Sequence, residues 1–191
     1  MWVADLTGLS YRGYRADTES GFAAGLPGLN RRLDLDADGD PDNYLVYEPY
    51  QDQGNDAVQT ETWQTWDAYR GGAALWWGNG PVAAEGCGQA TPCTLPVLLD
   101  LFRDATIRED PATDGFRGSL SLNAGSYNPD QVGAVDRLSV GVGDETTTFD
   151  FGSRPLGKAD CKKGGWETNF NDYRDQGDCV SHFASAGKKR H

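Results

Sequence analysis

Apolar and polar residues alternate along this chain in short stretches, and the clearest alternation lies in residues 33–36, where Leu and Asp take turns. A two-residue period is typical of a strand with one buried face. An acidic turn follows over residues 38–42, and residues 44–47 (Tyr-Leu-Val-Tyr) favour a pleated sheet. The stretch LDLDADGDPDNYLVYE therefore predicts two strands joined by a turn rich in aspartate.

Similar short patterns recur through the rest of the chain, separated by Gly, Pro and Asp. Residues 7–30 are rich in Gly, Ser and Ala, and we expect extended chain there with short strands at most. Thr94 has the position of a helix N-cap, with Pro96 in the first turn and apolar residues after it. Further strands are expected over residues 2–6, 58–65, 74–77, 105–109, 119–122, 135–142 and 146–151.

Many short strands with one helix predict an all-β fold, and we expect a jelly-roll-like antiparallel β-sandwich. The 25 glycines and nine prolines agree with a chain of many turns. At 191 residues the chain can hold one sizeable domain and a small appendage. We expect the sandwich over residues 1–152, a linker over 153–160 and a small disulfide-closed tail over 161–191.

The net charge of −12 narrows the classes of partner. Such a surface repels phosphate backbones and anionic lipids, so nucleic acid is not an expected partner. No apolar run approaches the roughly 18 residues that a membrane-spanning helix needs. The first residues lack the basic and apolar stretches of a signal peptide, so we expect a mature sequence with an added initiator Met.

The four cysteines fall into two local pairs, Cys87 with Cys93 and Cys161 with Cys179. These spacings suit short disulfide-closed loops, although four cysteines allow three connectivities. Zinc is the alternative, but no Cys-x2-Cys occurs and the only histidines are His182 and His191. Disulfides imply an oxidising compartment, so we expect a secreted protein, extracellular or associated with the cell wall.

The acidic turn is the candidate metal site, and calcium is the metal that its oxygen-only donors suit. Its spacing matches the first nine positions of an EF-hand loop, but Leu45 takes the place of the bidentate Glu at position 12. Glu48 or Asp67 is a candidate for a more distant ligand. The alternative is an exposed acidic turn that aids solubility. The predicted ligands are Asp34, Asp36, Asp38, Asp40 and Asp42.

Aromatic residues gather over residues 63–77, where they form a candidate glycan-binding group. Flat aromatic faces stack on the C–H surfaces of sugar rings, and the predicted ligand contacts are Trp66, Tyr69 and Trp77. Trp76 and Trp77 are adjacent, so in a strand one of them faces the core and the other lies outside it or under a loop. The alternative is that all these tryptophans pack in the core.

Two portions of the chain resemble known families. The acidic hairpin, WQTWDAY, GGAALWW, the Cys-bounded loop and GAVDRLSVG…TTTFDF are together similar to β-sandwich modules of secreted, often actinobacterial, proteins. The closing strands resemble those of concanavalin-like and laminin-G-like sandwiches. The tail, CKKGGW…F…QG-CV, resembles the endings of many secreted actinobacterial proteins. The resemblance implies a secreted module with a disulfide-closed tail and carries no activity.

Catalytic motifs are missing from the sequence: it has no G-x-S-x-G, no P-loop and no G-x-G-x-x-G. A Ser-His-Asp triad would need His182 or His191, and we expect His182 to be a partly packed tail residue. We therefore expect a non-catalytic, calcium-stabilised module that binds an extracellular or cell-surface partner, with a polysaccharide as the candidate. The alternatives are a self-associating structural subunit of an extracellular layer or filament, and a glycan-active hydrolase.

Overall fold

The chain divides into two compact units, Met1–Phe149 and Asp150–His191, in the computed structural model. Each unit is considered by itself. The predicted linker, 153–160, lies outside the described residues. The structure describes residues 1–17, 25–40, 42–108, 120–123, 131–151, 161–162, 166 and 173–186, with the backbone alone for 183–186.

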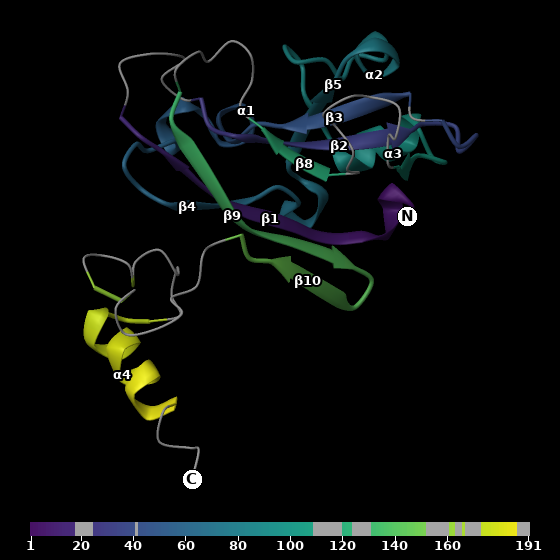
Figure 1. The fold of residues 1–191 in the computed structure, drawn as a ribbon. Coiled ribbons are helices and arrows are strands. Elements are labelled where there is room, and N and C mark those ends of the chain that lie inside the picture. Colours follow the sequence, from purple (N-terminus) through teal and green to yellow (C-terminus); the bar gives the residue numbers. More distant parts are fainter. Residues whose placement is uncertain are drawn as a thin grey trace. The chain divides into compact units, whose positions relative to one another are not determined.

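The first unit consists of two antiparallel sheets that face each other (Figure 1). In the described part of this unit, the four-stranded sheet runs β10 (Glu145–Phe149), β9 (Gly133–Val142), β1 (Leu6–Arg15) and β4 (Gln64–Asp67). The six-stranded sheet runs β6 (Cys93–Thr94), β5 (Leu75–Gly78), β3 (Asn43–Tyr47), β2 (Gly28–Asp34) and β7 (Thr106–Ile107), and β8 (Leu120–Asn123) also pairs with β2. The expected all-β sandwich is confirmed, and its jelly-roll connectivity stays a prediction.

One strand was not expected at its full length. Residues 7–30 were predicted to hold short strands at most, but β1 covers ten residues and is the inner partner of both β9 and β4. Its buried residues do follow a two-residue period from Leu9 through Tyr11. Gly13 and Arg15 take the next two buried positions, so the pattern does not read as hydrophobic. A Cβ on Gly13 would lie 2.6 Å from Leu26 Cδ2, so a larger residue there would require the Leu26 side chain to move.

The other predicted strands are placed with varying accuracy. The strand expected over residues 58–65 begins only at Gln64, the first residue of β4, and residues 58–63 form a loop. The side chain of Gln64 holds this loop, because it accepts a hydrogen bond from the Gln59 N–H and donates one to the Ala57 carbonyl. The strand expected over residues 2–6 is reduced to a single bridge between Trp2 and Thr106, followed by the 3₁₀ helix η1 (Val3–Asp5).

The predicted helix is confirmed as α3 (Leu95–Leu101), which begins after Thr94 and has a proline in its first turn. The expectation of a single helix is wrong. Two further helices of five residues each have a proline, Pro49 or Pro81, in their first turn, and segments this short carry no helical periodicity in the sequence. The further helices in the described residues are α1 (Pro49–Gln53), α2 (Gly80–Ala84), α4 (Gln176–Ala186) and the 3₁₀ turns η2 (Asn55–Ala57) and η3 (Arg70–Gly72).

Aromatic side chains join the two sheets in the core. Tyr11 of β1 meets Tyr47 of β3 edge to face, with ring centroids 6.4 Å apart, and Tyr47 contacts Trp76 of β5 at 5.4 Å. Such pairs stabilise a core by about 0.5–1.5 kcal/mol beyond their buried area. Their polar atoms are satisfied, since the Tyr11 hydroxyl donates to the Pro27 carbonyl and the Trp76 indole N–H to the Ala68 carbonyl.

Arg31 of β2 is a charged residue inside this core. It is fully buried, and its Cζ lies 3.9 Å from the centre of the Trp76 ring. Within the described part of the chain, none of its three guanidinium nitrogens has a hydrogen-bond partner. Burial lowers the pKa of Arg31 to about 9, so the guanidinium is still charged at neutral pH.

Replacing this charge should stabilise the protein. An unpaired buried ion costs several kcal/mol, whereas a desolvated cation–π contact returns only about 2 kcal/mol. We expect Arg31→Met to raise the free energy of unfolding by about 1–3 kcal/mol, as measured by urea denaturation at pH 7. The exposed Arg103→Met should change it by less than about 0.5 kcal/mol. A loss of stability in Arg31→Met would show that the guanidinium contributes favourably to the core.

Candidate metal centre

The acidic turn joins β2 to β3 and is closed by backbone pairing at its base. Leu33 pairs with Asn43, and the Asp42 N–H donates to the Leu33 carbonyl at 2.9 Å. Asp34 is the last residue of β2 and is fully buried. The pairing therefore brings the two ends of the turn, Asp34 and Asp42, to the same end of the hairpin.

Hydrogen bonds to aspartate side chains shape the turn itself. Asp34 Oδ2 accepts the Gly39 N–H at 3.0 Å, and Asp42 Oδ2 accepts the Leu35 N–H at 2.8 Å. Asp38 Oδ1 accepts the Asp40 N–H at 2.9 Å, the two-residue step that short acidic side chains favour. Gly39 has a φ of +108°, a conformation that suits glycine. The backbone thus wraps around the carboxylates.

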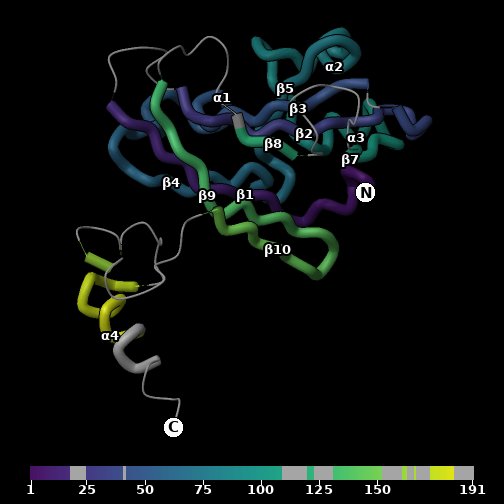
Figure 2. The backbone as a smooth tube through the Cα atoms, in the orientation of Figure 1, coloured from purple at the N-terminus to yellow at the C-terminus, as the bar shows by residue number. Residues whose placement is uncertain are grey.

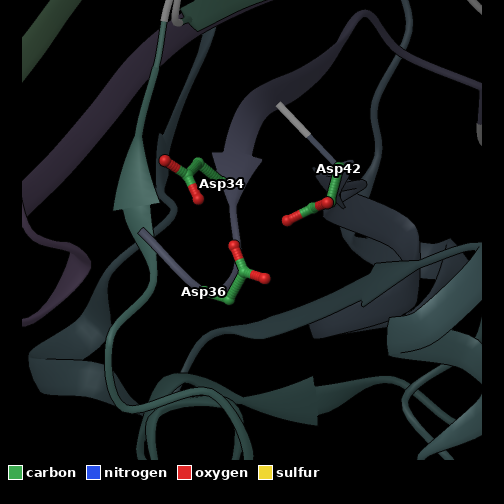
Figure 3. A group of neighbouring side chains, drawn as sticks. All are labelled: Asp34, Asp36 and Asp42. Carbon is green, nitrogen blue, oxygen red and sulfur yellow. The ribbon is translucent and has the colours of Figure 1, made fainter. Parts of the chain in front are cut away.

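Three of the five predicted ligands come together. Asp34, Asp36 and Asp42 each offer a carboxylate oxygen, and these oxygens all lie within 4.8 Å of one another. Figure 3 shows the three carboxylates directed toward a common space. Asp38 and Asp40 lie outside this group, and all the turn aspartates except Asp34 are exposed.

Neither of the two candidates for a distant ligand belongs to this group. The Glu48 carboxylate accepts the indole N–H of Trp77 at 2.9 Å and the Tyr50 hydroxyl at 3.2 Å. The Asp67 carboxylate accepts the backbone N–H groups of Tyr69 and Arg70. Both side chains are engaged in local structure.

The two oxygens of Asp34 differ in their surroundings. Oδ2 accepts the Gly39 N–H and the Arg108 Nε–H, the latter at 3.2 Å. Oδ1 is buried and, among the described residues, has no hydrogen-bond partner. Burial raises the pKa of Asp34, but the backbone N–H groups of Gly39 and Ala37 and the Arg108 guanidinium outweigh it, so the pKa is lowered overall. A charged and buried oxygen without a donor favours a nearby cation.

The chemistry of this group fits a hard divalent cation. Calcium takes six to eight oxygens at about 2.3–2.6 Å in flexible geometry, and carboxylates, backbone carbonyls and water together can supply them. Magnesium demands a near-ideal octahedron at about 2.0–2.1 Å, which exposed and adaptable side chains such as Asp36 and Asp42 suit less well. The group contains no His or Cys, the preferred ligands of zinc.

The predicted aromatic ligands are divided between the core and the surface. Trp66 is only 2% exposed, so its expected stacking on a glycan is wrong: it packs in the core with Trp76. Trp77 is half-buried on the opposite face of β5 from Trp76, as expected for adjacent strand residues. Tyr69 is half-buried against the core. Trp63 is also half-buried, and the centroid of its ring lies 5.4 Å from the centroid of the Tyr14 ring.

The cysteines form the two expected disulfides, Cys87–Cys93 in the first unit and Cys161–Cys179 in the second. His182 of α4 packs against the ring of Tyr173, with centroids 5.5 Å apart. His182 is exposed, and this ring contact agrees with the expected partly packed tail residue. His191 lies outside the described residues.

Arg108 contacts the candidate metal site and was not predicted from the sequence. It follows β7 and stands 74 positions from Asp34, and no local pattern links a lone arginine to an acidic turn at that separation. The pairing of β7 with β2 brings them together, since Asp34 lies opposite Thr106.

The lowered pKa of Asp34 makes a prediction for the ion-free protein. Its charged form stabilises the fold above the unfolded pKa of about 4, and this contribution is lost as the pH falls through the lower folded value. In chelator at pH 7, Asp34→Asn should lose about 1–3 kcal/mol of unfolding free energy, and at pH 3 the gap should narrow. Asp104→Asn, at an exposed position, should show neither effect. A gap of equal size at both pH values would contradict this assignment.

Comparisons with known proteins found nothing similar to this chain. The chain matches no family model, and the searches of curated proteins and of solved structures found no match. In the described residues, no helix is long and apolar enough to cross a membrane. The resemblance to secreted concanavalin-like and laminin-G-like modules accordingly stays a prediction.

Proposed function

We propose that this chain is a secreted, non-catalytic β-sandwich module that calcium stabilises and that binds an extracellular or cell-surface partner. The observation that carries the calcium site is the buried carboxylate of Asp34: its Oδ1 has no hydrogen-bond partner among the described residues, and one of its oxygens lies within 4.8 Å of oxygens of Asp36 and Asp42. An acidic turn that served only solubility would keep its charges in water. Asp34 instead carries its charge in the interior, where a divalent cation compensates it.

The site would stabilise the fold because its ligands come from both ends of the β2–β3 turn. An ion bound to Asp34 and Asp42 ties the end of β2 to the start of β3, in addition to the backbone pairing there. A ligand that binds only the folded state stabilises it by about 2.7 kcal/mol at 100 times its dissociation constant. Extracellular calcium modules typically bind at about 10⁻⁴–10⁻³ M, which suits the calcium levels outside cells.

Two disulfides support the extracellular assignment, because such bonds persist in oxidising compartments. The proposed jelly-roll connectivity and the resemblance to secreted modules agree with it. A net charge of −12 repels polyanionic partners, and it is compatible with an extracellular medium rich in divalent cations.

A glycan is the proposed partner, and the outer face of the six-stranded sheet is the proposed contact surface. Trp77 and Tyr44 both alternate with core residues of their strands, so they share the face that points away from the core. Val46 of β3 pairs with Trp77 of β5, so Tyr44, two residues before Val46, is the diagonal neighbour of Trp77. Arg32 and Glu48 flank the two rings with polar groups that can bond sugar hydroxyls.

A self-associating structural subunit is the second candidate, and one observation favours it. β10 lies at the edge of the four-stranded sheet, and all of its residues are exposed, with Phe149 at 48%. An exposed edge strand is a template for pairing with another chain. Size-exclusion chromatography with and without calcium separates this candidate from a monomeric binding module.

Calcium should raise the melting temperature of the protein. We expect saturating calcium to stabilise it by about 2–3 kcal/mol relative to chelator, a shift of roughly 4–12 °C, with a saturable heat signal in titration calorimetry. Asp36→Asn removes an exposed ligand without disturbing the core, and it should abolish most of the shift. The matched Asp104→Asn should retain it. An unchanged melting temperature in wild type would overturn the proposal.

Glycan binding should depend on Trp77. In pulldowns with insoluble polysaccharides, Trp77→Ala should bind at least about tenfold more weakly, because an aromatic anchor at the centre of an interface carries much of its binding energy. Trp2→Ala, at an exposed tryptophan outside the proposed contact surface, should bind as wild type does. Blank pulldowns and blank glycan arrays with wild type would remove the glycan as partner.

A further inference from the structure

The contact between Arg108 and Asp34 is set by the sheet. β7 pairs with the end of β2, Leu33 opposite Ile107 and Asp34 opposite Thr106, and the Arg108 N–H donates to the Arg32 carbonyl at 3.2 Å. The chain start also borders β7, since the Ile107 N–H donates to the Met1 carbonyl; Figure 2 shows β7 beside the N-terminus. The backbone of Arg108 is therefore fixed beside the acidic turn before any ion binds.

A second ion pair in the same molecule shows what a purely structural arrangement looks like. Arg70 Nη1 lies 2.9 Å from Asp52 Oδ2, with side-chain exposures of 40% and 0%, close to the 44% and 0% of Arg108 and Asp34. Asp52 Oδ1 also accepts a hydrogen bond, from the Leu75 N–H. Both oxygens of Asp52 are thus satisfied within the protein.

Asp34 differs from Asp52 in this respect. Its Oδ2 is occupied by Gly39 and Arg108, whereas its Oδ1 has no partner among the described residues. The carboxylate can therefore hold the guanidinium on one oxygen and a cation on the other at the same time. Two positive charges would then share one carboxylate and repel each other.

We propose that Arg108 sets the calcium affinity of this site by weakening it, an inference that rests on the proposed function. Removing Arg108 would lower the repulsion and raise the negative charge of the ligand group, and calcium affinity follows that charge. Arg108 also helps to hold Asp34 in place. That role is shared, because the Gly39 N–H and the β2–β7 pairing hold the same residue. Repulsion is therefore the larger effect of the guanidinium on binding.

The buried charge of Asp34 explains why a positively charged arginine lies beside a proposed calcium site. In the ion-free chain the Arg108 guanidinium pairs with the buried carboxylate of Asp34 and compensates part of its charge. With the ion bound, three carboxylates and one guanidinium leave a local charge of −2, which a divalent ion neutralises. The expected dissociation constant for calcium is therefore high, in the range that suits millimolar calcium.

The test is titration calorimetry with calcium chloride on the whole chain and three variants. Arg108→Gln should bind calcium about tenfold more tightly than wild type. Arg108→Lys keeps the charge and should stay within about threefold of wild type. Arg70→Gln breaks the matched pair, so it should lower the melting temperature and leave calcium affinity unchanged.

The outcomes separate this inference from the proposed function. Silence in wild type and in all variants would remove the calcium site itself, and the role of Arg108 with it. Binding by wild type with equal or weaker binding by Arg108→Gln would overturn the role of Arg108 alone. Should Arg108→Gln fail to fold, Arg108→Lys decides: a tenfold loss of affinity would show that guanidinium geometry, and not charge, sets the binding.

Discussion

A buried carboxylate at the end of β2 is the constraint on which this structure depends. Asp34 is fully enclosed, its lowered pKa keeps it charged, and one of its oxygens has no donor among the described residues. Burying an ion without compensation costs several kcal/mol, a large share of the stability of a typical domain. The surrounding turn, the arginine after β7 and the proposed cation all reduce that cost. We propose that calcium binding contributes to the stability of the hairpin for this reason.

The position of β2 explains why this end of one strand matters to the rest of the fold. β2 pairs with β3 along one side and with both β8 and β7 along the other, so any loosening at Asp34 reaches three neighbours. The same strand carries Arg31 into the aromatic core over Trp76. Two buried charges of opposite sign thus lie within four residues of each other. One faces the aromatic core without a hydrogen-bonded partner among the described residues, and the other is held by Arg108 and the turn.

Sequence reasoning succeeded where the decisive contacts are local. The acidic turn and the two disulfides could be located because their residues lie close together in the chain. It failed where the contact is distant or the pattern is concealed. Arg108 meets Asp34 only through strand pairing, and β1 carries Gly13 and Arg15 at buried positions. Tryptophan is a common sugar-stacking residue, so Trp66 was predicted to bind a glycan. The local sequence pattern does not reveal that the face of β4 that carries Trp66 meets the core.

The most direct test of the central claim is a crystal structure determined in millimolar calcium. We predict an ion about 2.3–2.6 Å from Asp34 Oδ1, with oxygens of Asp36 and Asp42 also in its coordination shell and the Arg108 guanidinium still hydrogen-bonded to Asp34 Oδ2. A well-resolved map that shows only water among these carboxylates, or a protein donor on Asp34 Oδ1, would contradict it.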